Sequence, residues 1–280
     1  MCLILFSHRA TPGYRLILAA NRDEFYARKT APLQRWGREG RIISGRDLQA
    51  GGTWLGATVT GRFGGLTNYR EVQETEADRR SRGEILIRYL DSDMSAAAFV
   101  EHLHRESDRY RGFNLVVGDH HSLYYCSNRA GAPQRLGAGV HALSNHLLDT
   151  SWPKVERGKC LFRKLLYRKM VATEDVFAML ADRRQPPLHE LPQTGIGLEW
   201  EKILAPIFIR SEVYGTRSSA VLTIDDDGQC RFHERTYATE AAGNFSEAGY
   251  TFATGCSGRQ NEDIQYNNSE DPRRRSSARE

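Results

Sequence analysis

The sequence predicts an α+β domain built on antiparallel sheets, with helix layers outside them. Strand patterns come first, followed by helices, more strands, more helices and a final hairpin, which is not the βαβ alternation of a doubly wound parallel sheet. The early strands follow one another across short glycine-containing turns, and such tight connections join antiparallel neighbours. With 280 residues, 40% of them hydrophobic, the chain can bury a sizeable core.

A hairpin is expected at the N-terminus. The apolar run at residues 3–6 predicts a buried strand, and a turn at residues 11–14 leads to a second strand over residues 15–20. We expect this second strand to end at the polar residues 21–24, with a long loop following to Gly40. The next strands are expected over residues 42–44, 53–58 and 62–67.

Helices are expected where the hydrophobic period changes. One runs from residue 81 or 82 to residue 90, and the next spans residues 95–104 with Ser95 as its N-cap. A third runs to about residue 167 with Ser151 as its cap and Pro153 in its first turn. A fourth spans residues 173–180 with Thr173 as its cap.

The remaining strands complete the predicted sheets. They are expected over residues 113–118, 123–127, 140–144, 218–225 and 229–236, with residues 185–197 as a loop. Asp226-Asp227-Gly228 is a favourable turn for the last hairpin. We expect one domain over residues 1–240 and a polar tail over residues 241–280, disordered after Thr254.

Composition narrows the function classes. The net charge of +4 is mild and comes partly from arginines near the C-terminus, so nucleic-acid binding is not expected. No apolar run reaches the roughly 20 residues that a membrane helix needs, and no secretory signal is visible. The five cysteines are widely spaced and odd in number, which favours free thiols in the cytoplasm. Metal-site, haem-attachment and nucleotide-binding motifs are absent from the sequence, so no cofactor is expected.

Cys2 directly follows the initiator methionine. If Met1 is removed, one residue carries both a thiol and an α-amine, and an amine with a pKa of about 7.7–8.0 can act as the base that activates the thiol. The alternative is that Cys2 is a small hydrophobic residue at the start of a buried strand, a common place for a free cysteine.

The polar tetrad Asn21-Arg22-Asp23-Glu24 follows the strand that should pair with the one carrying Cys2. A hairpin of this length brings Asp23 near the α-amine of Cys2, and Arg22 would pair with a carboxylate. The tetrad could equally be a solvated turn with a cap residue.

Asn68 and Asn145 each end a predicted strand. A side-chain amide there can donate to an oxyanion, although asparagine also favours strand ends because it suits turns. Arg217 begins a late strand, where it would either steady the site by its charge or be an exposed cation.

Several motifs together carry a family resemblance: Met1-Cys2, Asn21-Arg22-Asp23-Glu24, Gly51-Gly52-Thr53-Trp54-Leu55-Gly56, Thr67-Asn68-Tyr69-Arg70, Leu143-Ser144-Asn145 and Tyr214-Gly215-Thr216-Arg217. With them the chain resembles the NRDE family, that of the transport and Golgi organisation protein 2, up to about Thr236. That family in turn resembles the choloylglycine hydrolase and penicillin V acylase group. The resemblance implies a four-layer αββα fold of the N-terminal nucleophile hydrolase type.

The resemblance also implies roles for individual residues. Cys2 matches the nucleophile of those hydrolases, Asp23 the aspartate near it, Asn68 and Asn145 the oxyanion and amine-orienting asparagines, and Arg217 a late arginine. Arg22, Asn21, Trp54 and Tyr69 are predicted to bind substrate. The sequence departs from those hydrolases at Ala20, where they have an arginine, so Arg22 is expected to approach the site from a different side.

The sequence leaves two functions open. The first is an N-terminal cysteine amidohydrolase that cleaves the C–N amide, or an ester or thioester, of a small acylated substrate without a cofactor. The second is a non-enzymatic carrier or chaperone of the transport and Golgi organisation protein 2 type, with haem or a lipid as cargo. A family can keep an enzyme's fold without its chemistry.

Overall fold

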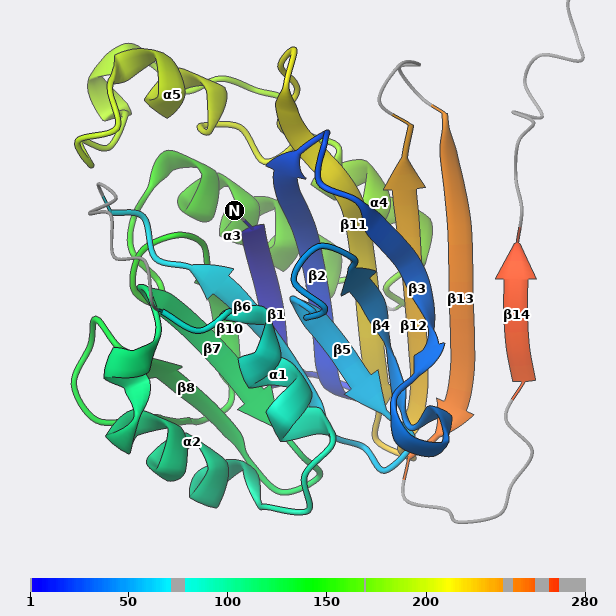
Figure 1. Ribbon diagram of the computed structural model, residues 1–280. Helices are drawn as coiled ribbons and strands as arrows, with labels where there is room; N and C mark the ends of the chain where they lie inside the picture. The colour runs from blue at the N-terminus through cyan, green and yellow to red at the C-terminus, as the bar shows by residue number, and fades with distance from the viewer. Residues whose placement is uncertain (1, 72–78, 169, 239–243, 255–261, 267–280) are drawn as a thin grey trace, which may run out of the picture.

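Two antiparallel sheets packed face to face form the centre of the molecule (Figure 1). The computed structural model describes residues 2–71, 79–168, 170–238, 244–254 and 262–266. Within these residues the first sheet has the strand order β10-β1-β2-β11-β12-β13-β14, and the second has the order β3-β4-β5-β6-β7-β8-β9. Helices cover the outer faces, so the predicted αββα arrangement is confirmed.

The strands of the first sheet are β1 (Cys2–Thr11), β2 (Tyr14–Phe25), β10 (Gly139–Leu143), β11 (Tyr214–Asp225), β12 (Gln229–Tyr237), β13 (Phe245–Ala253) and β14 (Glu262–Tyr266). Those of the second are β3 (Thr30–Trp36), β4 (Ile42–Asp47), β5 (Leu55–Thr58), β6 (Phe63–Asn68), β7 (Phe113–Gly118), β8 (Leu123–Ser127) and β9 (Gln134–Leu136). The α-helices are α1 (Gly83–Leu90), α2 (Ala96–Arg105), α3 (Pro153–Leu166), α4 (Thr173–Leu180) and α5 (Leu198–Ile203), with 3₁₀ turns at Arg38–Gly40, Ser107–Arg109 and Leu188–Glu190.

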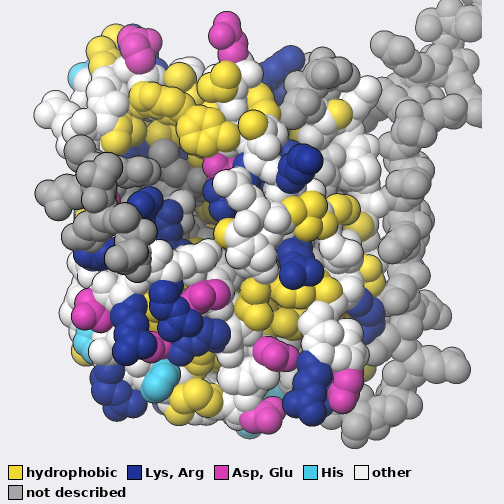
Figure 2. Space-filling model, in the orientation of Figure 1, with side chains coloured by type: hydrophobic (Ala, Val, Ile, Leu, Met, Phe, Trp, Pro, Cys, Tyr) yellow, Lys and Arg dark blue, Asp and Glu magenta, His cyan; other side chains and the backbone are white. Residues whose placement is uncertain are grey.

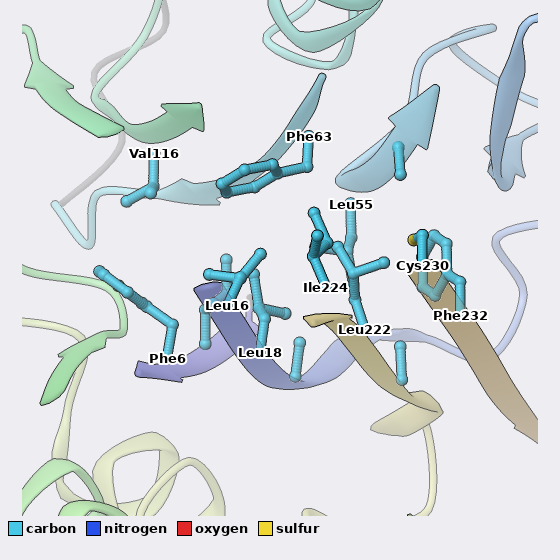
Figure 3. Packing of buried hydrophobic residues seen from close by; sticks show 14 of the residues in the cluster. Phe6, Leu16, Leu18, Leu55, Phe63, Val116, Leu222, Ile224, Cys230 and Phe232 are labelled. Carbon is cyan, nitrogen blue, oxygen red and sulfur yellow. The ribbon is translucent and has the colours of Figure 1, made fainter. Parts of the chain in front are cut away.

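Strand alternation explains why the first half of β1, residues 2–6, is apolar. Ile4 and Phe6 point into the core between the two sheets, which also holds Leu18, Leu55 and Phe63 (Figure 3). The alternate residues Leu3 and Leu5 point to the opposite face and belong to a second core beneath α3 and α4. A third core lies between the second sheet and the helices α1 and α2. Because β1 is buried on both faces, its sequence reads as a continuous hydrophobic run.

Several local predictions are confirmed. The Ser95 side chain caps α2 by accepting a hydrogen bond from the Ala98 N–H. Gly228 closes the turn between β11 and β12 with a φ of 81°, a conformation that glycine adopts without steric cost. The predicted caps of the next two helices are wrong, because α3 has Trp152 at its N-cap position and α4 has Ala172.

Other predictions missed strands or helices. Strand β3 lies in the predicted loop, and its Pro32 is tolerated because β3 is an edge strand. Strand β9 and helix α5 were not expected. Strand β2 continues to Phe25, so the tetrad 21–24 lies within a strand rather than after one.

The predicted boundary at residue 240 does not mark the end of the sheet. Strand β13 pairs with β12 along its length, and its Tyr250 and Phe252 are buried, so this segment is part of the domain. The strand β14 pairs with β13 beyond Thr254, while the rest of the predicted disordered tail, residues 255–261 and 267–280, lies outside the described residues. None of the helices in the described part of the chain is long and apolar enough to span a membrane.

Candidate active site

The tetrad divides its side chains between the two faces of β2. Cys2 is paired directly with Arg22, and Leu3 with Asn21. Successive side chains on a strand point to opposite faces. Arg22 therefore faces the second sheet, where it meets Trp54, while Asn21 and its neighbour Asp23 face the helices.

Cys2 is one of the residues that line a cavity of about 380 Å³. The start of β1, which carries Cys2, lies next to the ends of β2 and β6 (Figure 1). The Cys2 side chain is 8% exposed. Burial raises the pKa of the thiol and nearby Asp23 raises it further, whereas Arg22 and a backbone hydrogen bond from Asp23 lower it. The backbone N–H of Asp23 thus stabilises the thiolate form that a nucleophile requires.

Asp23 is fixed by two hydroxyl groups from β11. Thr216 Oγ1 donates to Asp23 Oδ1 at 2.7 Å, and the Tyr214 hydroxyl donates to the Asp23 backbone oxygen at 2.9 Å. Burial raises the pKa of the carboxyl group, and the nearby Lys154 is the largest influence that lowers it. A buried carboxylate held this rigidly beside Cys2 can orient the α-amine.

Arg22 is stacked over the Trp54 ring, with its guanidinium carbon 4.3 Å from the ring centroid. Its Nη2 lies 3.9 Å from Asp47 Oδ2. Its Nη1 is buried and has no hydrogen-bond partner among the described residues. Arg22 also lines the cavity. Its Nη1 could therefore donate a hydrogen bond to an anionic or carbonyl oxygen of a ligand.

The two predicted asparagines have different positions. Asn68 lines the cavity with Cys2. Asn145 is fully buried, and its amide donates to the Asn68 backbone oxygen at 3.0 Å. The adjacent Ser144 hydroxyl donates to the Cys2 backbone oxygen at 3.3 Å. Asn145 and Ser144 therefore fix the end of β6 against the start of β1, while Asn68 remains at the cavity surface.

Besides Asn145, three predicted residues do not line this cavity. Asn21 donates to the backbone oxygens of Leu180 and Ile207 at 2.9 and 2.8 Å, and it accepts from Ser219 Oγ at 2.6 Å. Arg217 Nη1 donates to three backbone oxygens of the segment that follows β2, those of Phe25, Tyr26 and Arg28. Tyr69 lies in a neighbouring groove, where its hydroxyl is 2.8 Å from His146 Nε2.

This groove, of about 810 Å³, continues from the cavity. The two share the lining residues Glu24, Arg28, Asn68, Arg79, Arg82 and Arg111. One wall is cationic and the other is apolar. The cationic wall consists of Arg28, Arg79, Arg82, Arg111 and Arg129, and the apolar wall of Phe25, Ile196, Trp200, Leu204 and Tyr214. Figure 2 shows hydrophobic side chains over α5 at the top of the view, with Lys and Arg side chains below them.

The cationic wall is crowded. Burial, and then the charge of Arg111, lower the pKa of Arg82 to about 10. Arg129 is partly neutralised by Glu71, with Nε and Oε2 2.9 Å apart. An anionic ligand would relieve the repulsion between these guanidinium groups. No local sequence pattern indicates this wall, because its arginines come from four separate loops.

Behind Asp23 lie charged groups that the sequence analysis also missed. Lys154 of α3 is 4% exposed, and next to it Arg70 and Glu201 form a buried ion pair with Nη1 and Oε2 2.6 Å apart. Lys154 occupies the same helical face as the buried Gly158 and Phe162. The sequence feature that could have indicated these charged groups is the lysine on the face of α3 whose other side chains are buried.

Among the described residues, no three His, Cys, Asp or Glu side chains gather closely enough to hold a metal ion. Cys2, Arg22, Asp23, Trp54 and Asn68 all line one cavity. This arrangement has the elements of acyl transfer: a thiol, a carboxylate beside it, a side-chain amide and a cation.

Sequence comparisons give a consistent family. The family model for Transport and Golgi organisation 2 matches residues 1–239. The Transport and Golgi organization 2 homolog of Mus musculus is 34% identical over 273 residues, covering 90% of this chain and 99% of that protein. The human homolog is 33% identical with the same coverage, and the Drosophila melanogaster protein is 28% identical over 265 residues, covering 84% of this chain and 92% of its own.

Structural comparisons give more distant similarities. A variant of conjugated bile acid hydrolase from Clostridium perfringens aligns with a TM-score of 0.49 at 9% identity, covering 95% of this chain and 97% of that chain. A Caenorhabditis elegans N-acylethanolamine-hydrolyzing acid amidase ortholog aligns with a TM-score of 0.42 at 11% identity, covering 79% of this chain and 92% of that chain.

Proposed function

The chain belongs to the Transport and Golgi organisation 2 family, and we propose that it is an N-terminal cysteine amidohydrolase that cleaves the C–N amide bond of a small, anionic, acylated substrate. The observation that carries the proposal is the position of Cys2. It begins β1 and lines a cavity, with Asn68 also on the cavity wall and the backbone N–H of Asp23 bonded to its sulfur.

In the proposed reaction, removal of Met1 leaves the α-amine on Cys2. The amine takes the thiol proton, and the sulfur attacks the carbonyl carbon of the substrate. The Asn68 amide donates to the resulting oxyanion, and one such donor contributes roughly 3 kcal/mol to lowering the barrier. The C–N bond then breaks, and the protonated α-amine gives its proton to the leaving amine.

The second half of the reaction regenerates the enzyme. Water attacks the Cys2 thioester while the α-amine accepts a proton from it. The C–S bond breaks, which releases the carboxylic acid, and the protonated α-amine returns its proton to the sulfur to restore the thiol. Asp23 orients the α-amine throughout, because its own carboxylate is fixed by Thr216. Esters and thioesters would follow the same course with an alcohol or thiol as the leaving group.

The substrate class follows from the groove. An acyl group would lie against the apolar wall that includes Phe25 and Trp200, and an anionic group would meet the wall that includes Arg82 and Arg111. Arg22, with an N–H available in the cavity, would hold an oxygen close to the scissile bond. We propose that the reaction takes place in the cytoplasm, and the free thiols of the described cysteines Cys2, Cys126, Cys160 and Cys230 support this proposal.

The test uses intact mass and turnover. The purified protein is expected to lack Met1 and to form one acyl adduct on Cys2 when it is mixed with N-acyl amino acids of different chain length. Cys2→Ala is expected to abolish hydrolysis, whereas Cys160→Ala, which removes an exposed thiol on α3, leaves it unchanged. Retention of Met1 on all molecules, or undiminished hydrolysis by Cys2→Ala, would refute the mechanism.

A carrier function is the second candidate, because a groove of about 810 Å³ with one apolar and one cationic wall also suits amphiphilic anions that are bound without chemistry. Haem, which has an apolar ring and two carboxylates, is one such cargo, and a lipid is another. A stoichiometric Soret shift on haem titration that disappears in a His or Cys variant, together with no Cys2-dependent hydrolysis, would favour the carrier.

A further inference from the structure

Tyr69, which lines the groove, is hydrogen-bonded to His146 behind it. The Tyr69 hydroxyl oxygen is 2.8 Å from His146 Nε2, and the centroids of the two rings are 4.9 Å apart. That hydroxyl has no second hydrogen-bond partner among the described residues. The oxygen of Tyr69 can therefore form a further hydrogen bond with a ligand in the groove.

The two asparagines of the candidate site position this pair. Tyr69 directly follows Asn68, which lines both the cavity that holds Cys2 and the groove. His146 directly follows Asn145, whose amide donates to the Asn68 backbone oxygen at 3.0 Å. The pair therefore lies beside the cavity, and a ligand that extends from the cavity into the groove meets Tyr69.

Thr150 determines which ring nitrogen of His146 carries the proton. The Thr150 hydroxyl donates its proton to the backbone oxygen of Leu147 at 2.8 Å. A hydroxyl has only one proton, so Thr150 Oγ1 can only accept from His146 Nδ1, which is 2.9 Å away. Burial lowers the pKa of His146 below its ordinary value of 6.5, so the ring is neutral near pH 7. The single ring proton is therefore on Nδ1.

The tautomer of His146 decides how Tyr69 can bind a ligand. An Nε2 atom without a proton can only accept, so the Tyr69 O–H donates to it. The phenol has no second proton, and Tyr69 thus presents an acceptor to the groove and no donor. This favours a ligand with an N–H group at that place, because a ligand oxygen there would face the Tyr69 oxygen without a proton between them.

We propose that Tyr69 accepts a hydrogen bond from the amide N–H of the substrate, and that His146, held by Thr150, is the positioning residue that fixes the Tyr69 hydroxyl in this sense. A secondary amide carries an N–H next to its carbonyl group, whereas an ester has an oxygen at the same place. The pair therefore selects amides over esters. The choice of substrate rests on the proposed function, but the tautomer of His146 does not.

The first test is the tautomer, which nitrogen NMR of labelled histidine rings reports near neutral pH. The His146 signals are assigned by their loss in His146→Gln, and we expect the proton on Nδ1. Thr150→Val keeps the shape of the side chain and removes the acceptor, so it should move the proton to Nε2, whereas the control Thr150→Ser should leave it on Nδ1. A wild-type proton on Nε2, or the same tautomer in both variants, would overturn the proposal.

The second test measures recognition of the N–H with the Cys2→Ala protein, so that neither probe is hydrolysed at the thiol. The probes are N-decanoylglycine and its ester analogue O-decanoylglycolate, which has an oxygen in place of the N–H. The ester is expected to bind about tenfold more weakly, because it leaves the Tyr69 oxygen unpaired. Tyr69→Phe and Thr150→Val should each lose this preference. Equal Kd values for the two probes, or binding of neither, would refute the recognition.

Tyr167→Phe is the matched control for the loss of a phenol hydroxyl. Tyr167 follows α3 and is 89% exposed, so this variant should keep the preference for the amide. The outcome is separable from the proposed function. Cys2-dependent hydrolysis with equal Kd values would refute the role of Tyr69 alone, whereas a preference for the amide without Cys2-dependent hydrolysis would refute the hydrolase and leave this recognition standing.

Discussion

The buried ion pair between Arg70 and Glu201 gives a prediction whose magnitude can be worked from the structure. Arg70 Nη1 and Glu201 Oε2 are 2.6 Å apart, with side-chain exposures of 3% and 5%. Glu201→Gln removes the negative charge and leaves the Arg70 guanidinium buried without a counter-charge, which costs about 3–5 kcal/mol. For a domain of this size, a loss of that order lowers the Tm by roughly 10 °C.

The same variant should affect the groove. Glu201 lies on α5 next to Trp200, and its carboxylate holds Thr194 through two hydrogen bonds. Loosening α5 should therefore raise the KM for an acylated substrate, because Trp200 is part of the apolar wall. Measurement of KM and kcat on the folded fraction separates this effect from the loss of stability.

Urea unfolding with matched variants completes the test. Lys202→Met removes an exposed ion pair with Glu199 on the same helix, 2.7 Å apart, and should change the free energy of unfolding by less than about 1 kcal/mol. The double variant Arg70→Met/Glu201→Gln should recover more than half of the loss, because no charge remains buried alone. A free energy of unfolding for Glu201→Gln within about 1 kcal/mol of the wild type would show that this reasoning about burial is wrong.

Three further predictions concern residues away from the cavity. Asn21→Ala leaves the carbonyl oxygens of Leu180 and Ile207 without their donor, so it should lower the free energy of unfolding by about 3 kcal/mol while the KM of the folded protein stays the same. Burial raises the pKa of Glu234 to about 7, above its ordinary value of 4.5. Its contribution to stability is therefore full below pH 4.5 and is lost as the pH rises through 7, so Glu234→Gln should remove about 3 kcal/mol of pH dependence between pH 5 and pH 8 in urea unfolding. Although burial opposes it, bonds from His141 and Lys159 hold the pKa of Asp149 at about 2. That stability is present above pH 4 and is lost as the pH falls toward 2, and Asp149→Asn should abolish this acid-side loss in thermal unfolding.

The local pattern of the sequence predicted those parts of the fold that depend on neighbours along the chain. The N-terminal hairpin, α2 with its Ser95 cap and the turn at Gly228 each follow from residues within a few positions. The edge strand β3 and the strand β13, second from the edge of its sheet, were missed because only a few of their side chains are buried, and so their apolar period is weak.

Only those contacts of the candidate site that join neighbouring strands along the chain were predicted from the sequence. The hairpin brought Cys2 and Asp23 together in the prediction because the pairing of β1 with β2 is local. Lys154, 131 residues beyond Asp23 in the chain, and the α5 residue Glu201 reach the site only through packing of separate layers. No pattern along the sequence encodes such a contact, although a lysine on the buried face of α3 marks it as unusual.

The tetrad at residues 21–24 lies within strand β2, and this changes the interpretation of the missing arginine at position 20. From the sequence, Arg22 was expected to approach the site from a different side than an arginine at position 20. Because β2 continues through both positions, and side chains two residues apart share a face, Arg22 and Ala20 point toward the second sheet together.

Ala20 pairs with Ile4 in the core, whereas Arg22 pairs with Cys2 itself. In this chain the arginine therefore lies on that face directly across from Cys2. Asp23 keeps the opposite face, where Thr216 and the charge of Lys154 stabilise it. The Arg22 guanidinium and the Asp23 carboxylate can therefore be adjacent in sequence without neutralising each other.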